Sequence, residues 1–103
     1  IQNVACAGSF FMNPVVSEDI QKQFETEKGV ASKNGRVPAG WLIEKAGMKG
    51  VAVGGALCSL MHPNYLVNTG TATSDDVLLL SRRIVDAVFT MFGVTLEREV
   101  SVL

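Results

Sequence analysis

The strongest constraint on the fold is the apolar periodicity between Thr73 and Gly93. Apolar residues recur there at three- and four-residue steps, at Val77, Leu80, Ile84, Val88 and Met91. They follow residues 73–76, Thr-Ser-Asp-Asp, which have the form of a capping box with Asp where Glu is usual. We therefore expect the longest helix of the chain here, with its apolar face packed against other elements. Arg82 and Arg83 are expected on its solvated face.

Two shorter helices are predicted before this one. Ser17 precedes two acidic residues and reads as an N-cap, and Gly29 is a natural stop, so the helix between them has about ten residues. Pro38 is suited to the first position of a second, short helix that ends at Gly47. We expect Trp41 of that helix in the core.

The remaining apolar segments are short and favour strands. Residues 51–58 predict two strands, or one strand with a bulge at the paired glycines, and residues 65–68 predict another. From Val94 onward, polar and apolar residues alternate, which predicts a final strand with Glu97 and Glu99 on one face and Leu96 and Arg98 on the other. This order of elements predicts an α+β fold, with helices covering one face of a small mixed sheet.

Residues 8–14, Gly-Ser-Phe-Phe-Met-Asn-Pro, concentrate possible chemistry near the start of the chain. If this segment is extended, Ser9 and Asn13 share one side with Phe11, while Phe10 and Met12 face the other. A hydroxyl and an amide would then share one surface. A Ser beside Gly is also common as a turn or strand residue with a satisfied hydroxyl, and that reading stays open.

Composition narrows the class of protein. With 103 residues and a net charge of -1, the chain has the length of one domain and no basic cluster for nucleic acid. Its apolar runs break before the roughly 18 to 20 residues of a membrane span, and no secretion signal is visible, so a cytoplasmic protein is expected. Cys6 and Cys58 lie far apart and His62 is the one histidine, so we assign no metal and expect buried free thiols.

Five blocks of sequence, in order, carry a resemblance to a known family. They are AGSFFMNP at 7–14, PAGWLIEKAGMKG at 38–50, VGGA at 53–56, HPNYLVNTGTATSDDV at 62–77 and FGVTLEREV at 92–100. Together they resemble the C-terminal domain of UDP-N-acetylenolpyruvoylglucosamine reductase, over nearly the whole chain. This flavoenzyme family completes UDP-N-acetylmuramate in bacterial peptidoglycan synthesis. The resemblance implies that residues 1–103 form a substrate-binding domain whose FAD-binding domains precede Ile1 and are absent from this chain.

The resemblance also implies the reaction and its residues. In this family NADPH reduces FAD, and hydride then passes from the flavin to the enolpyruvyl ether of UDP-N-acetylenolpyruvoylglucosamine. Ser9 matches the serine that donates the proton to the neighbouring carbanion, and Glu99 matches the glutamate that assists at the substrate carboxylate. Asn13 and His62 match positions that contact the substrate, His62 near its uridine diphosphate. We expect no cofactor to bind tightly to this chain alone, and no turnover.

Departures from the family pattern keep an alternative open. Met12 stands where the family often has Lys or Arg, and residues 58–61 are less polar than in many members. The chain is thus also compatible with a non-catalytic α+β binding or interaction module of reductase-like sequence. A nucleotide-binding regulatory domain is a weaker alternative, because no phosphate-cradling glycine loop is present.

Overall fold

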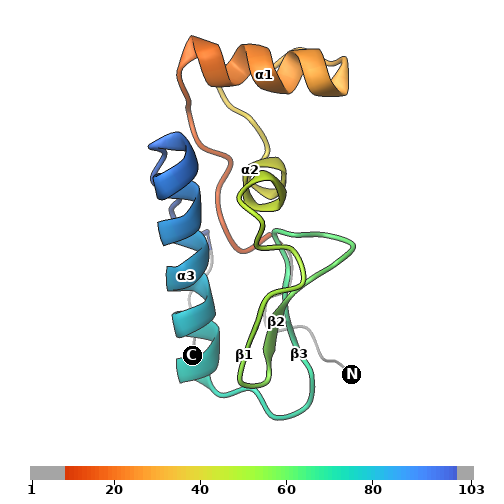
Figure 1. Cartoon of the computed structure of the whole chain (residues 1–103), viewed down its shortest axis with the longest axis vertical. Helices are drawn as coiled ribbons and strands as arrows, with labels where there is room; N and C mark the ends of the chain where they lie inside the picture. The colour runs from red at the N-terminus through yellow and green to blue at the C-terminus, as the bar shows by residue number, and fades with distance from the viewer. Residues whose placement is uncertain (1–8, 100–103) are drawn as a thin grey trace.

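The computed structural model describes residues 9–99. The helices are α1 (Glu18–Lys28), α2 (Ala39–Lys45) and α3 (Ser74–Phe92), and the strands are β1 (Ala52–Val53), β2 (Ala56–Cys58) and β3 (Leu66–Asn68) (Figure 1). The predicted α+β fold is confirmed. Within it, the three named strands pair in the order β1-β2-β3 and are antiparallel throughout, rather than mixed.

Helix α3 has the boundaries and caps that its sequence predicts. The Thr73 hydroxyl accepts from the backbone N–H of Asp76 at 3.1 Å, and the Asp76 carboxylate accepts from the Thr73 N–H at 3.2 Å. Gly93 ends the helix in the left-handed conformation, with φ 70°. Arg82 and Arg83 are exposed, as expected. The apolar face of α3 packs against β1, β2 and α2.

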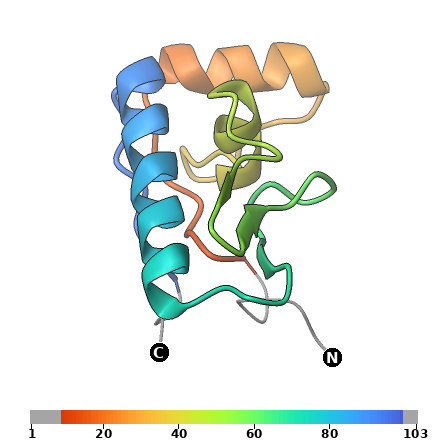
Figure 2. The same cartoon turned by 60° about the horizontal axis from the view of Figure 1, so that its bottom comes forward.

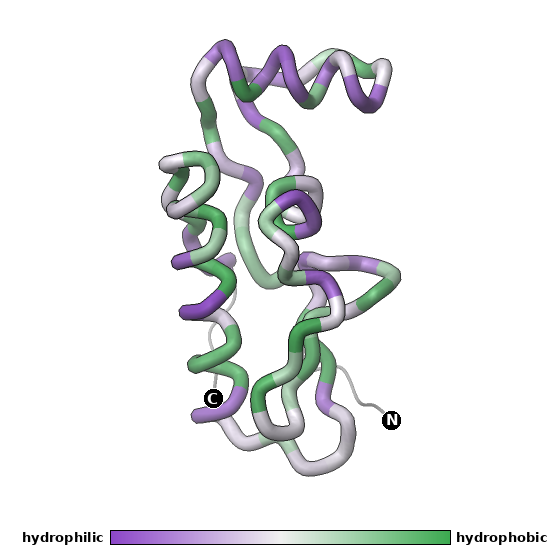
Figure 3. Tube along the Cα trace, viewed as in Figure 1, coloured by the Kyte–Doolittle hydropathy of each residue, from purple (hydrophilic) through white to green (hydrophobic). Residues whose placement is uncertain are grey.

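Helix α1 lies across one end of the molecule and runs crosswise to α3 (Figures 1 and 2). Ser17 and Gly29 cap it as predicted. Its surface is largely hydrophilic (Figure 3), and it buries Ile20 and Phe24. This polar character is consistent with a helix that covers one end of the core rather than passing through it.

Helix α2 places Trp41 in the core, where 6% of its surface is exposed. Pro38 is the N-cap rather than the first helical residue, a difference of one position. The Trp41 indole N–H donates to the Glu27 carboxylate at 3.0 Å, and Lys45 pairs with the same carboxylate. Hydrogen bonds from Lys45 and then Trp41 hold the pKa of Glu27 below its usual value. These contacts join α2 to α1.

The sheet begins with a tight hairpin, so the two-strand alternative for residues 51–58 is correct. Val53 pairs with Ala56 across the Gly54-Gly55 turn. A side chain at Gly55 would meet the backbone nitrogen of Ala72 at 2.4 Å, so only glycine fits there. The N–H of Gly55 also donates to the Asp76 carboxylate at 3.3 Å. The hairpin is therefore fixed against the start of α3.

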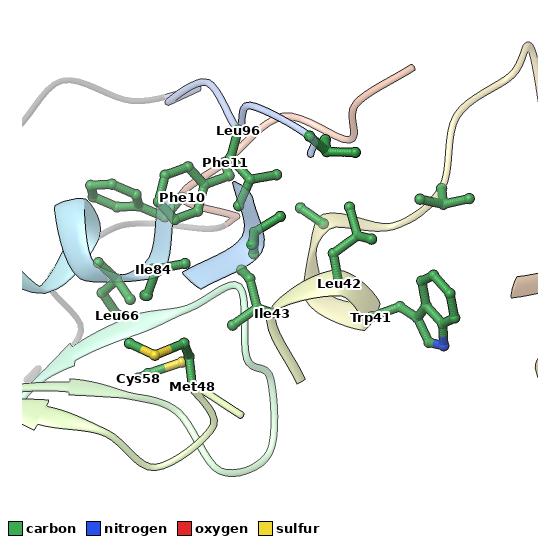
Figure 4. Packing of buried hydrophobic residues seen from close by; sticks show 14 of the residues in the cluster. Phe10, Phe11, Trp41, Leu42, Ile43, Met48, Cys58, Leu66, Ile84 and Leu96 are labelled. Carbon is green, nitrogen blue, oxygen red and sulfur yellow. The ribbon is translucent and has the colours of Figure 1, made fainter. Parts of the chain in front are cut away.

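The start of the described chain departs from the predicted alternation. Phe10 and Phe11 are both buried, with 0% and 1% exposed, and their rings meet edge to face at 5.0 Å (Figure 4). Their consecutive N–H groups both donate to Asn64, one to its backbone oxygen and one to its side chain, at 2.8 and 2.9 Å. A regular strand sends consecutive N–H groups in opposite directions, so the segment bends here instead.

The predicted final strand does not form between Val94 and Glu99, the part of it that the structure describes. Residues 94–99 form one isolated antiparallel bridge, Phe11 with Arg98. Val94 and Leu96 are buried as core residues, whereas Arg98 is exposed. The pairing stays short because its partner is the bent segment and not an edge of the sheet. The continuation of the alternation beyond Glu99, and Cys6, lie outside the described residues.

Candidate active site

Three of the four residues matched to the family site line one open cavity of about 300 Å³. Ser9 comes from the first described residues, Asn13 from the end of the bent segment, and His62 from the loop between β2 and β3. All three side chains are exposed in this chain. The other lining residues are Pro38, Gly40, Met61, Pro63, Asn64 and Tyr65. Tertiary structure thus gathers groups from two distant parts of the sequence, the segment of Ser9 and Asn13 and the loop of His62.

Asn13 presents only part of its amide to the cavity. Its side-chain oxygen accepts from the N–H of Ala39 at 2.9 Å, at the start of α2. This contact replaces the side-chain cap that Pro38 cannot supply. The amide NH₂ is the group of Asn13 that is best placed to serve a ligand, since its oxygen already accepts from Ala39.

His62 is held by a tight loop. The Ser59 hydroxyl accepts from the N–H groups of Met61 and His62, at 3.2 and 3.1 Å. The N–H of Tyr65 donates to the His62 carbonyl at 2.7 Å, and the rings of the two residues lie 5.2 Å apart. Tyr65 is a cavity residue that the sequence analysis missed. Its position in an expected strand gave no sign that its ring would lie beside His62.

Asn64 was also missed, although it is the most deeply buried polar residue of the cavity, with 8% exposed. Its side-chain oxygen accepts from the Phe11 N–H and its NH₂ donates to the Phe11 carbonyl, both at 2.9 Å. The Pro63-Asn64 pair is a turn signal in the sequence. That signal could not reveal a partner more than fifty positions away.

Glu99 lies beside the same segment but does not line the cavity among the described residues. Its backbone N–H donates to the Phe10 carbonyl at 2.8 Å, one residue beyond Ser9. The Met12 N–H donates to the Glu97 carbonyl at 2.8 Å, so both glutamates flank the bridge at Arg98. Both are exposed. The fold therefore brings the backbone of Glu99 close to that of Ser9 without placing its carboxylate in the cavity.

A second groove, of about 560 Å³, shares Asn13 and Pro38 with the cavity. Its polar side includes Lys33 and Arg36, and no carboxylate is among its lining residues in the part of the chain described. One guanidinium nitrogen of Arg36 donates to the Asn13 carbonyl at 2.6 Å. The groove next to the candidate site is consequently positive.

Cys58 is a buried free thiol, as predicted, and supports the same loop. Its sulfur donates to the Pro63 carbonyl at 3.1 Å, and burial raises the pKa of the Cys58 thiol to about 11. Between residues 9 and 99, no three His, Cys, Asp or Glu side chains are grouped to hold a metal. No helix in that range is long and apolar enough to span a membrane.

Comparisons with known proteins agree with the resemblance in the sequence. Two curated relatives are UDP-N-acetylenolpyruvoylglucosamine reductases from Photobacterium profundum, 44% identical over 101 residues, and Desulfosudis oleivorans, 42% identical over 97. The matches cover 91% and 94% of this chain but 29% and 25% of those proteins. The chain thus spans less than a third of the length of either relative.

A solved structure gives the same match in three dimensions. The UDP-N-acetylenolpyruvylglucosamine reductase (MurB) from Thermus caldophilus superposes with a TM-score of 0.57 and 36% identity, over 90% of this chain and 26% of that one. Residues 2–103 match the family described as UDP-N-acetylenolpyruvoylglucosamine reductase, C-terminal domain. This chain therefore belongs to the family of UDP-N-acetylenolpyruvoylglucosamine reductase C-terminal domains.

Proposed function

We propose that this chain is the substrate-binding and proton-donating domain of a cytoplasmic UDP-N-acetylenolpyruvoylglucosamine reductase, which forms UDP-N-acetylmuramate for peptidoglycan. The observation that carries the proposal is the convergence of Ser9, Asn13 and His62 on one cavity. The family match covers all three residues, yet His62 lies far along the sequence from Ser9 and Asn13. Substrate sites are commonly concave and carry a few convergent polar groups.

The resemblance to the family assigns Ser9, Asn13 and His62 of this cavity to the substrate and none of its lining residues to a flavin. We therefore assign no FAD- or NADPH-binding residue to this chain. FAD and NADPH belong to the full-length enzyme, in which bound flavin supplies the hydride. The isolated chain is accordingly proposed to be inactive.

Ser9 is proposed to give a proton to the substrate carbon next to the carboxylate. The hydroxyl O–H bond breaks, the new C–H bond forms, and the resulting serine oxygen regains a proton from solvent. An aliphatic hydroxyl is a weak acid, so the transfer depends on holding its oxygen against the carbon. Glu99 is proposed to act at the substrate carboxylate, where a proton on Glu99 or a neighbouring cation would prevent repulsion.

The remaining polar groups suit the rest of the substrate. The free NH₂ of Asn13 can donate to an oxygen of the ligand, and His62 is proposed to lie near the uridine diphosphate. Beyond Asn13, Lys33 and Arg36 give the adjoining groove positive charge. A diphosphate is the kind of anion that guanidinium and ammonium groups bind well.

A single-turnover comparison in the natural full-length reductase tests the proposal. Ser9→Ala is expected to leave flavin reduction by NADPH unchanged and to slow flavin reoxidation by substrate about 10²- to 10⁴-fold, the usual contribution of a general acid. Ser81→Ala is the matched control, because the Ser81 hydroxyl donates to the Leu78 carbonyl within α3, away from the cavity. It should alter neither step.

Two outcomes would contradict the assigned role. Equal slowing of both half-reactions by Ser9→Ala would indicate general damage to the enzyme. An unchanged reoxidation rate would mean that the family match gives the fold without the chemistry. The non-catalytic binding module, which Met12 favours because it stands where the family often has Lys or Arg, would then be the better description.

A further inference from the structure

Asn64 is bonded to the residues that directly follow Ser9. Its backbone carbonyl accepts from the Phe10 N–H at 2.8 Å, and its side-chain amide exchanges two hydrogen bonds of 2.9 Å with the backbone of Phe11. Three hydrogen bonds with one residue therefore fix three consecutive peptide groups, the first of which joins Ser9 to Phe10. The paired bonds to Phe11 resemble those between residues of adjacent antiparallel strands, although here a side chain supplies both partners.

Because these hydrogen bonds are buried, the loss of one would leave a polar group without a partner. Asn64 is 8% exposed, and Phe10 and Phe11 are at most 1% exposed, so water cannot readily replace a lost partner. The rest of Asn64 is also enclosed, because the Cα of Gly40 on α2 packs beside it, where an added Cβ would lie 3.8 Å away. The amide is thus held in one orientation that serves Phe11 on both its donor and its acceptor side.

The same residue belongs to the loop that carries His62. Tyr65 donates to the His62 carbonyl at 2.7 Å and its own carbonyl accepts from Ser59 at 3.0 Å, which closes the loop around Asn64. Ser9 on one side and His62 on the other are therefore connected through Asn64. Asn64 thus joins the backbone next to the proposed proton donor directly to the loop that carries His62.

We propose that Asn64 is a positioning residue, which holds the Ser9 hydroxyl in place over the cavity by clamping Phe10 and Phe11. The inference rests on the proposed function of Ser9. One N–H and one lone pair of the Asn64 amide are bonded to Phe11, and the proposed role is therefore to act through Ser9. A displacement of about 1 Å at a reacting group can cost on the order of a hundredfold in rate.

The test uses the full-length reductase with Asn64→Leu, which keeps the branched shape of the side chain and removes both of its hydrogen bonds to Phe11. We expect flavin reduction by NADPH to be unchanged and flavin reoxidation by substrate to slow about tenfold to a hundredfold. Asn64→Asp keeps an acceptor for the Phe11 N–H but turns a second acceptor oxygen toward the Phe11 carbonyl, so slowing comparable to that of Asn64→Leu is expected. This second variant serves if Asn64→Leu does not fold.

Asn68 provides the matched control. Its side-chain oxygen also accepts two backbone N–H bonds, from Gly70 and Ala72 at 2.7 and 3.0 Å, but at the far end of β3. Asn68→Leu should lower thermal stability without changing the ratio of the two half-reaction rates. If it changes that ratio as much as Asn64→Leu does, a general loss of structure explains both and the inference is wrong.

A double variant separates positioning from mere stability. Once Ser9→Ala has removed the donor, adding Asn64→Leu should slow reoxidation no further, because Asn64 acts through Ser9. Slowing by the full factor of each single variant would overturn the inference. If Ser9→Ala itself does not slow flavin reoxidation, the proposed function of Ser9 is refuted, and the inference about Asn64 is refuted with it. If Ser9→Ala blocks reoxidation while Asn64→Leu and Asn64→Asp do not slow it, only the role of Asn64 is refuted.

Discussion

Helix α3 carries its boundaries in its own residues, whereas the segment from Ser9 to Asn13 takes its shape from residues far along the chain. Thr73 and Asp76 cap the helix within four positions, and Gly93 ends it. The segment from Ser9 to Asn13 has no capping residues of this kind within a few positions. Its backbone groups bond to Asn64 on one side and to Glu97 and Glu99 on the other.

The difference separates stability from geometry. Loss of an apolar contact on α3 lowers the free energy of unfolding of the whole domain. It does not shift one residue of the cavity relative to the others. Loss of a hydrogen bond at the bent segment changes where one hydroxyl lies while much of the core remains packed. Half-reaction rates and unfolding free energies should therefore respond to different residues.

The largest effect on stability is expected at Leu80, which is fully buried on α3. Leu80→Ala should lower the free energy of unfolding by about 2–5 kcal/mol, measured by urea denaturation. Leu79→Ala is the matched control, because Leu79 is 42% exposed on the same helix, and its cost should stay within about 0.5 kcal/mol. In folded full-length enzyme, neither should change the ratio of half-reaction rates. If Leu80→Ala changed the ratio of the two half-reaction rates, the proposed distinction between α3 and the segment from Ser9 to Asn13 would be wrong.

A smaller effect is expected from ionisation of Cys58, which lies beneath the site loop. Burial raises the pKa of its thiol from 9.0 to about 11, so the folded state holds its proton more tightly than the unfolded chain. This stabilisation is complete below pH 9.0 and is lost as the pH rises through about 11. By pH 11 the loss should be on the order of 2 kcal/mol.

Urea unfolding across this pH range checks the prediction. Other groups also titrate there, so the informative quantity is the difference between wild type and Cys58→Ala, which lacks the thiol. That difference in unfolding free energy should shrink as the pH rises above 9.0. A constant difference would show that the thiol does not ionise in a buried place.

The smallest effect is expected at Arg36, on the groove beside Asn13. Arg36→Glu replaces a cation with an anion near the proposed diphosphate, and the KM for UDP-N-acetylenolpyruvoylglucosamine should rise about tenfold. The rise should be smaller at high salt. Arg83→Glu is the control, because Arg83 is exposed on α3. An equal KM change for both variants would mean that the groove has no specific role.

Much of the fold could be predicted because its signals are local. The apolar period of α3, the caps at Ser17 and Gly29, and the glycine hairpin each depend on residues within a few positions. The resemblance to the reductase family also pointed to Ser9, Asn13 and His62, which the structure brings to one cavity. Within residues 94–99 the final strand was predicted wrongly, because the alternation there does not say which partner is available for pairing.

By itself, then, the sequence determined the α+β class, the helices and their caps, and the family of the chain, because local propensity and ordered motifs need no tertiary partner. Tertiary structure alone decided that both Phe10 and Phe11 are buried. It also decided that the side-chain oxygen of Asn13 accepts from the start of α2, and that Asn64 is hydrogen-bonded to the segment that follows Ser9. Those features depend on hydrogen bonds between distant residues, which form only after the core has brought their backbones together.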